Sequence, residues 1–401
     1  MLFRSMSELP ILIAGGGIGG FAAALALGRK GFPVKLIEQT REFGEVGAGI
    51  QLGPNIMRMF DVLGVTEEIR SAAVYPDMLT MRDGFNGEPV VEIPLGKDFE
   101  THFGRRYGVI FRPDLHNALI EAASSLPTVE TVSGVKVEGF RQKDNGVSVS
   151  TDAGILDGQA LIGADGLWSS VRSQLVGDGQ PRVAGHIAYR AVLPIEDVPE
   201  HMGQHRVTLW AGPKTHLVTY PLRRGEIFNV VAVFHSDRYE QGWDVYGDPE
   251  ELTERFRGQH PDVRSMIDKI ESWRMWVLCD RDPISNWSDG RVTLLGDAAH
   301  PTLQYMAQGA NMAVEDAVCL AHLLAVCDGN IERAFAEYPT KRYLRTARVQ
   351  LTSRFYGDIF HAAGPARDLR NLILPRRTPE QAYQGMAWLY GGVTDNGEQI
   401  I

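Results

Sequence analysis

Residues 11–38 read ILIAGGGIGGFAAALALGRKGFPVKLIE, and this stretch decides the fold. An apolar run precedes the glycine pattern Gly15-x-Gly17-x-x-Gly20, an alanine-rich segment follows it, and a second apolar run ends in Glu38. Glycine at these three places permits a tight turn, close approach of the backbone to a pyrophosphate, and packing of a helix on a strand. A carboxylate after the second strand is placed to accept hydrogen bonds from an adenosine ribose. A glycine-rich turn that binds nothing is the alternative, and the strand, helix and acid together argue against it.

Composition limits the classes of function. The 401 residues exceed one ordinary compact unit, so we expect two domains. With 40 Lys plus Arg against 50 Asp plus Glu, the net charge is -10, which disfavours nucleic acid and favours small-molecule partners.

Two further features bear on the compartment. Ile11–Gly28 is uncharged over eighteen residues, but six of them are glycine, so we expect a buried strand, turn and helix rather than a transmembrane or targeting segment. The three cysteines, Cys279, Cys319 and Cys327, fit neither a disulfide framework nor a zinc site. We expect reduced, mostly buried thiols, no bound metal and a cytoplasmic protein.

The pattern changes along the chain in a way that predicts an interrupted α/β domain. Apolar stretches at 207–210, 216–220 and 227–234 predict an antiparallel meander. Near Arg291 the first pattern returns, followed by a helical segment to about Ala325. We therefore expect a dinucleotide-binding domain from 1–77, 104–182 and 280–340, a substrate-binding sheet domain from 78–103 and 183–279, and a helical C-terminal region, 341–401. The basic stretch Lys341–Arg348 is interpreted as a solvated helix face.

Two later apolar runs end in glycine and aspartate, at Gly163-Ala164-Asp165-Gly166 and at Gly296-Asp297. Ligands of open α/β sheets bind at the carboxyl ends of the strands, so both aspartates are expected near one nucleotide. With a single complete fingerprint in the chain, these segments indicate one long cofactor, for which FAD fits better than NAD.

These motifs together resemble the single-component flavoprotein aromatic hydroxylases, the family of para-hydroxybenzoate hydroxylase and salicylate hydroxylase. The resemblance extends to about Arg348 and adds three segments. They are Gly47-Ala48-Gly49-Ile50 with Pro54-Asn55, Arg112-Pro113-Asp114-Leu115, and Gly296-Asp297-Ala298-Ala299-His300-Pro301 followed by Gln308-Gly309-Ala310-Asn311 and Glu315-Asp316.

The resemblance implies a Rossmann-like FAD-binding domain of the para-hydroxybenzoate hydroxylase type. It also implies an FAD-dependent monooxygenase that uses NADH or NADPH and dioxygen, and that hydroxylates an activated ring through a flavin C4a-hydroperoxide. The residues expected to hold FAD on this basis are Gly15, Gly17, Ile18, Gly20, Glu38, Gly49, Arg112, Asp165, Gly296, Asp297, Gly309, Ala310 and Asn311.

Two clues concern the substrate. Gln304 stands where the family commonly has proline, and strand alternation places His216, Val218 and Tyr220 on one face. An imidazole of near-neutral pKa beside a phenol is suited to deprotonating a hydroxyaryl ring, although a structural histidine is the alternative.

These clues resemble the family branch that converts 3-hydroxybenzoate to gentisate by hydroxylation at C6, in aromatic catabolism. The resemblance implies catalytic roles for His216, Gln304, Tyr220 and Tyr107. Candidates for binding the substrate carboxylate are Arg105, Arg106 and Arg190.

Two other functions are compatible with these motifs. One is a hydroxylase of the same family that acts on salicylate or on a hydroxypyridine carboxylate. The other is a flavin-binding sensor without turnover. The choice between NADH and NADPH is not readable from the sequence, and a homodimer is expected only because dimers are the commonest homo-oligomers.

Overall fold

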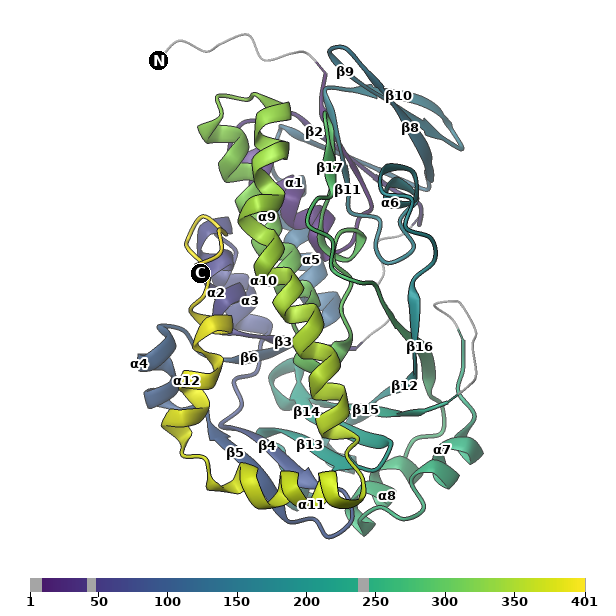
Figure 1. The fold of residues 1–401 in the computed structure, drawn as a ribbon, viewed down its shortest axis with the longest axis vertical. Helices are drawn as coiled ribbons and strands as arrows, with labels where there is room; N and C mark the ends of the chain where they lie inside the picture. Colours follow the sequence, from purple (N-terminus) through teal and green to yellow (C-terminus); the bar gives the residue numbers. More distant parts are fainter. Residues whose placement is uncertain (1–8, 42–47, 237–244, 401) are drawn as a thin grey trace.

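The computed structural model describes residues 9–41, 48–236 and 245–400. Two halves lie one above the other, and the long helix α10 (Ile331–Phe360) runs along both of them (Figure 1). The upper half contains the glycine-rich turn, and the lower half contains the large sheet. The predicted α/β architecture with a helical C-terminal region is confirmed.

The upper half is built on a six-stranded sheet in the order β17-β18-β11-β1-β2-β7. All neighbouring strands are parallel except the β17–β18 pair. Every residue of β1 is buried, which is typical of a central strand covered on both faces. The strands are β1 (Ile11–Ala14), β2 (Val34–Glu38), β7 (Val129–Ser133), β11 (Ala160–Gly163), β17 (Ser288–Asp289) and β18 (Val292–Leu294).

Helices α1 (Ile18–Arg29) and α9 (Gly309–Val326) pack on each other beside this sheet. Both are apolar almost all round, as expected of helices enclosed in a core. Within the described residues, only α9 is long and apolar enough to cross a membrane, and 72% of it is buried inside the protein. The strand β1, the glycine turn after it and the helix α1 confirm the strand, turn and helix expected at 11–28.

The lower half is a seven-stranded sheet in the order β16-β12-β15-β14-β13-β4-β5. The predicted meander is present as β13, β14 and β15, which pair antiparallel. One pairing differs from the antiparallel pattern of the other strands, because β4 joins β13 in parallel. Strands β4 and β5 form a hairpin, which comes from an earlier segment of the chain than the other strands of this sheet. The strands are β4 (Met78–Asp83), β5 (Pro89–Pro94), β12 (Arg182–Pro194), β13 (Arg206–Gly212), β14 (Thr215–Leu222), β15 (Ile227–His235) and β16 (Arg274–Asp280).

Smaller sheets, helices and 3-10 turns complete the described structure. The domain boundaries given above remain a prediction. The small sheets are β3 (Gly49–Leu52) with β6 (Gly108–Phe111), and β8 (Val137–Lys143), β9 (Gly146–Thr151) and β10 (Gly154–Gly158). The other helices are α2 (Pro54–Leu63), α3 (Thr66–Ala72), α4 (Lys97–Phe103), α5 (Arg112–Ser124), α6 (Ser170–Leu175), α7 (Pro249–Arg255), α8 (Pro261–Asp268), α11 (Gly364–Ile373) and α12 (Pro379–Tyr390). The 3-10 turns are η1 (Ile195–Asp197), η2 (Glu200–Met202), η3 (Arg223–Gly225), η4 (Gly296–Ala298), η5 (Gln304–Met306) and η6 (Leu374–Arg376).

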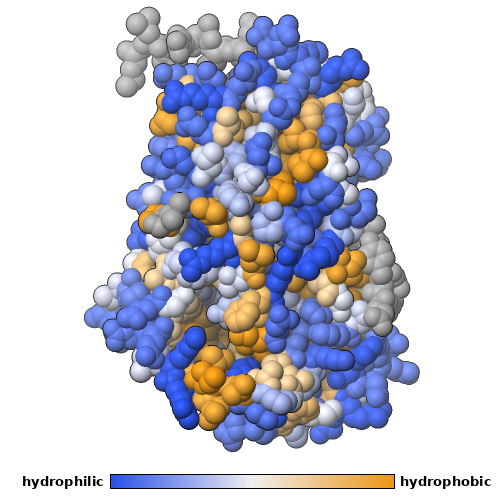
Figure 2. All heavy atoms as spheres, in the orientation of Figure 1, coloured by the Kyte–Doolittle hydropathy of each residue, from blue (hydrophilic) through white to orange (hydrophobic). Residues whose placement is uncertain are grey.

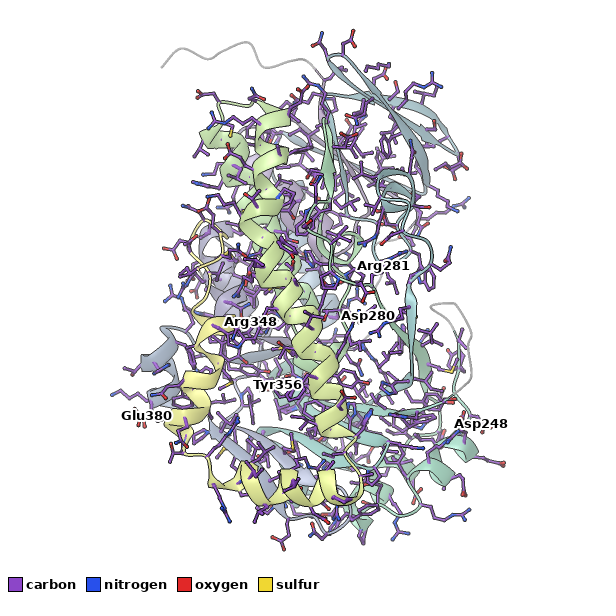
Figure 3. The ribbon with its side chains drawn as sticks, viewed as in Figure 1. Asp248, Asp280, Arg281, Arg348, Tyr356 and Glu380 are labelled. Atoms are coloured by element: carbon purple, nitrogen blue, oxygen red, sulfur yellow. The ribbon has the colours of Figure 1, made fainter. Side chains whose placement is uncertain are left out.

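The connection between the halves is fixed by a buried carboxylate. Asp280, at the end of β16 where the chain returns to the upper half, lies next to α10 (Figure 3). It is fully buried and accepts hydrogen bonds from Arg182 at the start of β12 and from Arg354 on α10. Both passages of the chain between the halves at β12 and β16 are thus tied to one group.

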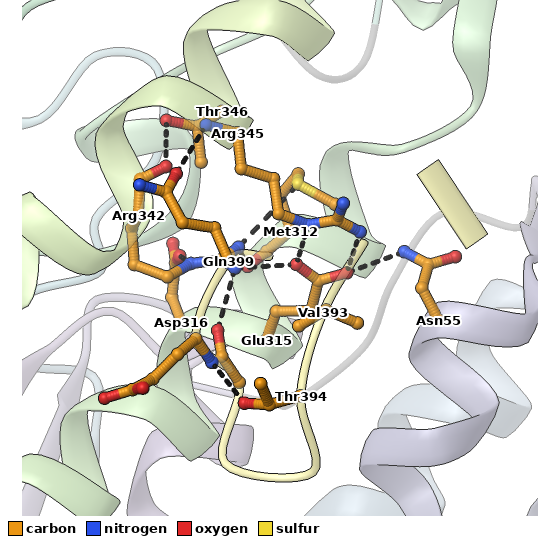
Figure 4. A network of polar contacts seen from close by, with 12 residues as sticks. Asn55, Met312, Glu315, Asp316, Arg342, Arg345, Thr346, Val393, Thr394 and Gln399 are labelled. Atoms are coloured by element: carbon orange, nitrogen blue, oxygen red, sulfur yellow. Dashed lines mark hydrogen bonds and ion pairs between the residues drawn. The ribbon is translucent and has the colours of Figure 1, made fainter. Parts of the chain in front are cut away.

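A second buried group of charges joins α9 to α10 (Figure 4). Arg342 lies 2.7 Å from both Glu315 and Asp316, and Arg345 forms two hydrogen bonds with Glu315 at 2.7 and 2.8 Å. Burial opposes ionisation of these carboxyls, but the charges of Arg345 and Arg342 lower the pKa of Glu315. Those of His300 and Arg342 lower the pKa of Asp316.

The interpretation of 341–348 as a solvated face is therefore wrong. Arg342 and Arg345 are only 0% and 5% exposed, because they pair with Glu315 and Asp316, the buried acids of α9. Spacing alone did not reveal these partners, which are about 30 positions earlier in the chain.

The outer surface of the C-terminal helices is partly apolar. Hydrophobic side chains follow the lower part of α10 and cover α11 (Figure 2). The three cysteines are buried and unpaired, as expected. The exposed apolar residues of these helices are Leu344, Leu351, Phe355, Leu369, Leu372 and Ile373.

Replacing Arg342 by Met should lower the free energy of unfolding by about 3–5 kcal/mol, because it leaves two buried carboxylates short of positive charge. Urea unfolding at pH 7 measures this loss. Both carboxyls have lowered pKa values, so the stability that they contribute is present above their ordinary values of 4.5 and 3.8 and is lost as the pH falls. The difference in the free energy of unfolding between wild type and variant should therefore become smaller at acidic pH.

Arg333→Met is the matched control, because Arg333 forms an exposed pair with Glu337 on the same helix. It should leave the unfolding midpoint unchanged. Equal destabilisation by both variants would contradict a special role for the buried group.

Candidate active site

One large cavity runs from the glycine turn of the upper half to the face of the seven-stranded sheet. Its volume is about 1820 Å³. Pockets of roughly 300–1,000 Å³ hold one ligand of ordinary size, so this cavity has room for a dinucleotide and a second small molecule.

The upper end of the cavity is made of backbone. Gly15 has φ of +104°, and a Cβ on it would lie 2.4 Å from the carbonyl oxygen of Ala164. No atom lies within 4 Å of the position a Cβ would take on Gly17, because this residue faces the open cavity. The turn therefore brings bare backbone to the cavity wall, as a pyrophosphate requires.

Two helices point their N-termini at this cavity. Gly17 precedes α1 and Gln308 precedes α9, and neither side chain caps its helix. Gly309 and Ala310 of α9 line the cavity, as do Gly17 and Ile18. The free N–H groups and the helix dipoles favour negative charge at both places.

The acidic residues at this end differ in what they bind. Glu38 lines the cavity and accepts a hydrogen bond from the Gly16 N–H at 2.6 Å. Asp165 lines the cavity too, but it accepts hydrogen bonds from Ser169 and Ser170 and so holds the start of α6. Asp297 is exposed to the cavity, and desolvation by the surrounding protein raises its pKa.

Most residues expected to hold a cofactor come together here. Gly20 does not line the cavity, because it packs against the Gly15 carbonyl. Asn311 is fully buried and hydrogen-bonded to the backbone of Gly53 and Gln51. Gly47 lies outside the described residues. The expected residues that do line the cavity are Gly15, Gly17, Ile18, Glu38, Gly49, Arg112, Asp165, Gly296, Asp297, Gly309 and Ala310.

The lower end is lined by side chains of the sheet. His216, Val218 and Tyr220 of β14 all line the cavity, whereas Leu217 packs into the core on the other face. Burial lowers the pKa of His216 to about 3, so the expectation of a near-neutral imidazole is wrong. Burial also raises the pKa of Tyr220. At neutral pH, His216 is an uncharged acceptor or donor and Tyr220 keeps its proton.

Gln304 and Arg190 form a pair at this end. The Nη2 of Arg190 donates to the Oε1 of Gln304 at 2.5 Å, and the guanidinium lies over the ring of Trp276. Burial lowers the pKa of Arg190 to about 10. The other two candidate arginines lie elsewhere: Arg105 pairs with Asp61, and Arg106 covers Tyr75.

Two more tyrosines line the cavity. Tyr107 donates a short hydrogen bond to Gln51, and burial raises its pKa. Tyr305 is hydrogen-bonded to the Nδ1 of His186 at 2.5 Å, and burial raises its pKa too. Both phenols are therefore protonated at neutral pH.

Several contributors to the site were not found from the sequence. Asn229 accepts a hydrogen bond from the Gly49 N–H, and Leu389 and Tyr390 of α12 line the cavity. His361 bonds His216 from the end of α10. These residues lie far from any motif in the chain, and no local spacing marks them.

The residues present fit FAD, which the sequence resemblance implies. The glycine cradle and the two uncapped helix N-termini suit its pyrophosphate and other electron-rich groups. The cavity is also long enough to continue to the polar groups on β14.

Comparisons with known proteins agree with this reading. A family model described as "FAD binding domain" matches residues 8–350. The chain is 49% identical over 386 residues to a 3-hydroxybenzoate 6-hydroxylase of Polaromonas naphthalenivorans (strain CJ2), covering 96% of each chain. It is 49% identical over 387 residues to one of Klebsiella oxytoca, covering 96% of this chain and 97% of that one. The crystal structure of Klebsiella pneumoniae HpxO complexed with FAD and uric acid superposes with a TM-score of 0.84 at 25% identity, covering 95% of this chain and 96% of that one.

Gly20→Ala should lower the flavin content of the purified protein and its thermal midpoint, because the new Cβ would lie 1.9 Å from the Gly15 carbonyl oxygen. The turn would have to move, and its backbone N–H groups would no longer point toward the pyrophosphate. The flavin-to-protein absorbance ratio measures the effect.

Gly96→Ala, directly before α4, is the control, since no atom lies within 4 Å of its Cβ position and Gly96 does not line the cavity. It should retain the wild-type flavin ratio. Full flavin occupancy in the Gly20 variant would show that the packing of this turn does not limit binding.

Proposed function

The chain belongs to the FAD binding domain family, and from that premise we propose that it hydroxylates 3-hydroxybenzoate to gentisate. It is a flavoprotein monooxygenase that uses FAD, a nicotinamide and dioxygen. The observation that carries the choice of substrate is the grouping of His216, Gln304 and Arg190 at one end of the cavity. The similarity to 3-hydroxybenzoate 6-hydroxylases over nearly the whole chain supports it.

Arg190 accounts for the carboxylate of this substrate. It is half-buried at the cavity wall, its Nε is buried without a hydrogen-bond partner, and among the described residues it forms no ion pair. A cation withdrawn from water without an anion is unfavourable, so an anionic ligand would stabilise Arg190 in this place. Of the three candidate arginines, Arg190 alone lines this cavity.

His216 and Gln304 account for the phenol. The Nδ1 of His216 is bonded to His361, which leaves Nε2 for the cavity. The Oε1 of Gln304 is held by Arg190, which leaves its NH2 group to donate to a phenolate oxygen. Loss of the phenolic proton raises the electron density at the carbon para to oxygen, which is C6 of this substrate.

FAD, when bound, supplies the electron transfer from the nicotinamide and the activation of dioxygen. The chain holds it with the glycine turn, the N-termini of α1 and α9, and Glu38 and Asp297. Apolar residues such as Val218, with Leu389 and Tyr390 of α12, keep water from the lower end. Tyr107 and Tyr220 offer protonated hydroxyls there.

Two expectations remain predictions. The unpaired, buried cysteines suit a cytoplasmic location. The exposed apolar residues of α10 and α11 suit a homodimer.

The purified holoenzyme should oxidise NADH or NADPH faster in the presence of 3-hydroxybenzoate, consume oxygen, and form gentisate in equal amount. A screen of hydroxybenzoate isomers with product identification tests this. Hydrogen peroxide without gentisate would make 3-hydroxybenzoate a pseudosubstrate. Catechol and carbon dioxide from salicylate would assign the alternative substrate, and no flavin reduction with any aromatic acid would favour a sensor.

Arg190→Met should raise the KM for 3-hydroxybenzoate about 10- to 100-fold, because a charge-assisted hydrogen bond contributes about 1.5–3 kcal/mol. The KM for 3-hydroxybenzamide, which has no carboxylate, should change much less. Steady-state oxygen uptake measures both.

Arg105→Met removes a guanidinium that pairs with Asp61 outside the cavity, and it serves as the control. It should leave the KM unchanged. An equal rise in the KM of acid and amide in the Arg190 variant would mean that Arg190 does not bind the carboxylate.

A further inference from the structure

Four histidines cluster at one place on the cavity wall, one in the lining and three behind it. They are His186 on β12, His216 on β14, His235 on β15 and His361 directly after α10. Of these, His216 alone lines the cavity. The other three lie behind it, and His186 and His235 are half-buried.

Three of the rings form a continuous hydrogen-bonded chain. The Nδ1 of His216 lies 2.7 Å from the Nε2 of His361. The Nδ1 of His361 lies 3.1 Å from the Nε2 of His235. His361 is 7% exposed and uses both of its ring nitrogens in these contacts. The chain thus leads from the cavity, through a buried ring, to a half-buried one.

The backbone keeps this chain in register. The Lys214 N–H donates to the carbonyl of His361 at 3.2 Å, and the His235 N–H donates to the carbonyl of Lys214 at 3.0 Å. The end of α10 is therefore bonded to the turn between β13 and β14, and that turn to β15. The outer two rings cannot drift apart without breaking these bonds.

The proposed reaction requires such an exit. Burial lowers the pKa of His216 to about 3, so a proton taken from a phenol cannot rest on this ring. Burial, then the neighbouring histidines, lower the pKa of His361, so the proton cannot rest there either. A proton that enters the chain has to pass through it.

We propose that His216, His361 and His235 form a proton relay between the substrate's phenolic oxygen and solvent. This inference rests on the proposed function, because it assumes a phenolic substrate beside His216. His361 and His235 act through His216 and do not touch the substrate.

The transfer balances if each neutral ring starts with its proton on Nδ1. The phenolic O–H bond breaks and an N–H bond forms at Nε2 of His216. The Nδ1 proton of His216 moves to Nε2 of His361, the Nδ1 proton of His361 moves to Nε2 of His235, and the Nδ1 proton of His235 passes to water. Every ring ends neutral in its other tautomer, and the reverse sequence restores the chain.

Charged and titratable groups surround the outer end. Burial has the largest effect on the pKa of His235 and lowers it. The charges of Lys214 and Arg255 lower it further, and that of Asp358 opposes them. His186 stacks on His235 with ring centroids 4.1 Å apart and is hydrogen-bonded to Tyr305. His186 therefore touches the chain without being one of its links.

The same rings offer a second possibility. Ring nitrogens of His186, His235 and His361 lie within 4.8 Å of one another, a spacing that a metal ion could bridge. Both nitrogens of His361 are already in hydrogen bonds, so a metal would have to break the chain. The geometry favours the relay, and the test includes the metal.

The experiment mixes oxidised holoenzyme with 3-hydroxybenzoate in weak buffer and follows proton release with an indicator dye in a stopped-flow instrument. His361→Gln should slow release by about 100-fold, because an amide can hydrogen-bond at both ends but cannot pass a proton by changing tautomer. His235→Gln should also slow it, and imidazole buffer should restore the rate in that half-exposed variant.

His186→Gln is the matched control, since it removes a ring from the same cluster but no link of the chain. It should release the proton within twofold of the wild-type rate. Unchanged release in His361→Gln, equal slowing in His186→Gln, absence of release in wild type, or a stoichiometric metal that survives dialysis against EDTA would each overturn the relay.

The two proposals fail in different ways. Fast proton release without gentisate would contradict the substrate assignment and leave the relay standing. Gentisate formation with normal release in both His361→Gln and His235→Gln would contradict the relay alone. If His361→Gln does not fold, His235→Gln with imidazole rescue gives the same answer.

Discussion

The buried carboxylates of Glu315 and Asp316 constrain the rest of the structure. Both side chains are fully buried, roughly two turns after the N-terminus of α9, and a buried carboxylate is unfavourable without a compensating charge. Asp316 binds Arg342, His300 and the Gly296 N–H, whereas Glu315 binds Arg345 and Asn55. Satisfying two acids therefore fixes the Gly-Asp loop, the start of α2 and the long helix α10. The N-terminus of α9, which faces the flavin cavity, is held in place by these bonds of Glu315 and Asp316.

The two ends of the cavity differ in how far the sequence could predict them. The cofactor end is made of backbone in a turn, and a turn is encoded by neighbouring residues. Gly15, Gly17 and Glu38 were found because a dinucleotide fixes their spacing. Alternation along one strand likewise placed His216 and Tyr220 on the cavity face.

The substrate end depends on partners that are remote in the chain, and these the sequence could not supply. Gln304 was found through a departure from the family pattern, but its bond with Arg190 joins residues 114 positions apart. His361 lies 145 positions from His216. The depth at which a group lies was equally unreadable, so the pKa of His216 and the burial of Arg342 were misjudged. Both errors came from assigning solution properties to groups that the fold removes from water.

Asp280 has a consequence for how ligands enter. It binds Arg182 and Arg354 at the point where the chain passes between the halves, so a hinge rotation would expose a buried carboxylate and break both of its ion pairs. Access that leaves Asp280 paired has to come through the rim of the cavity, where Leu389 and Tyr390 of α12 form part of the lining.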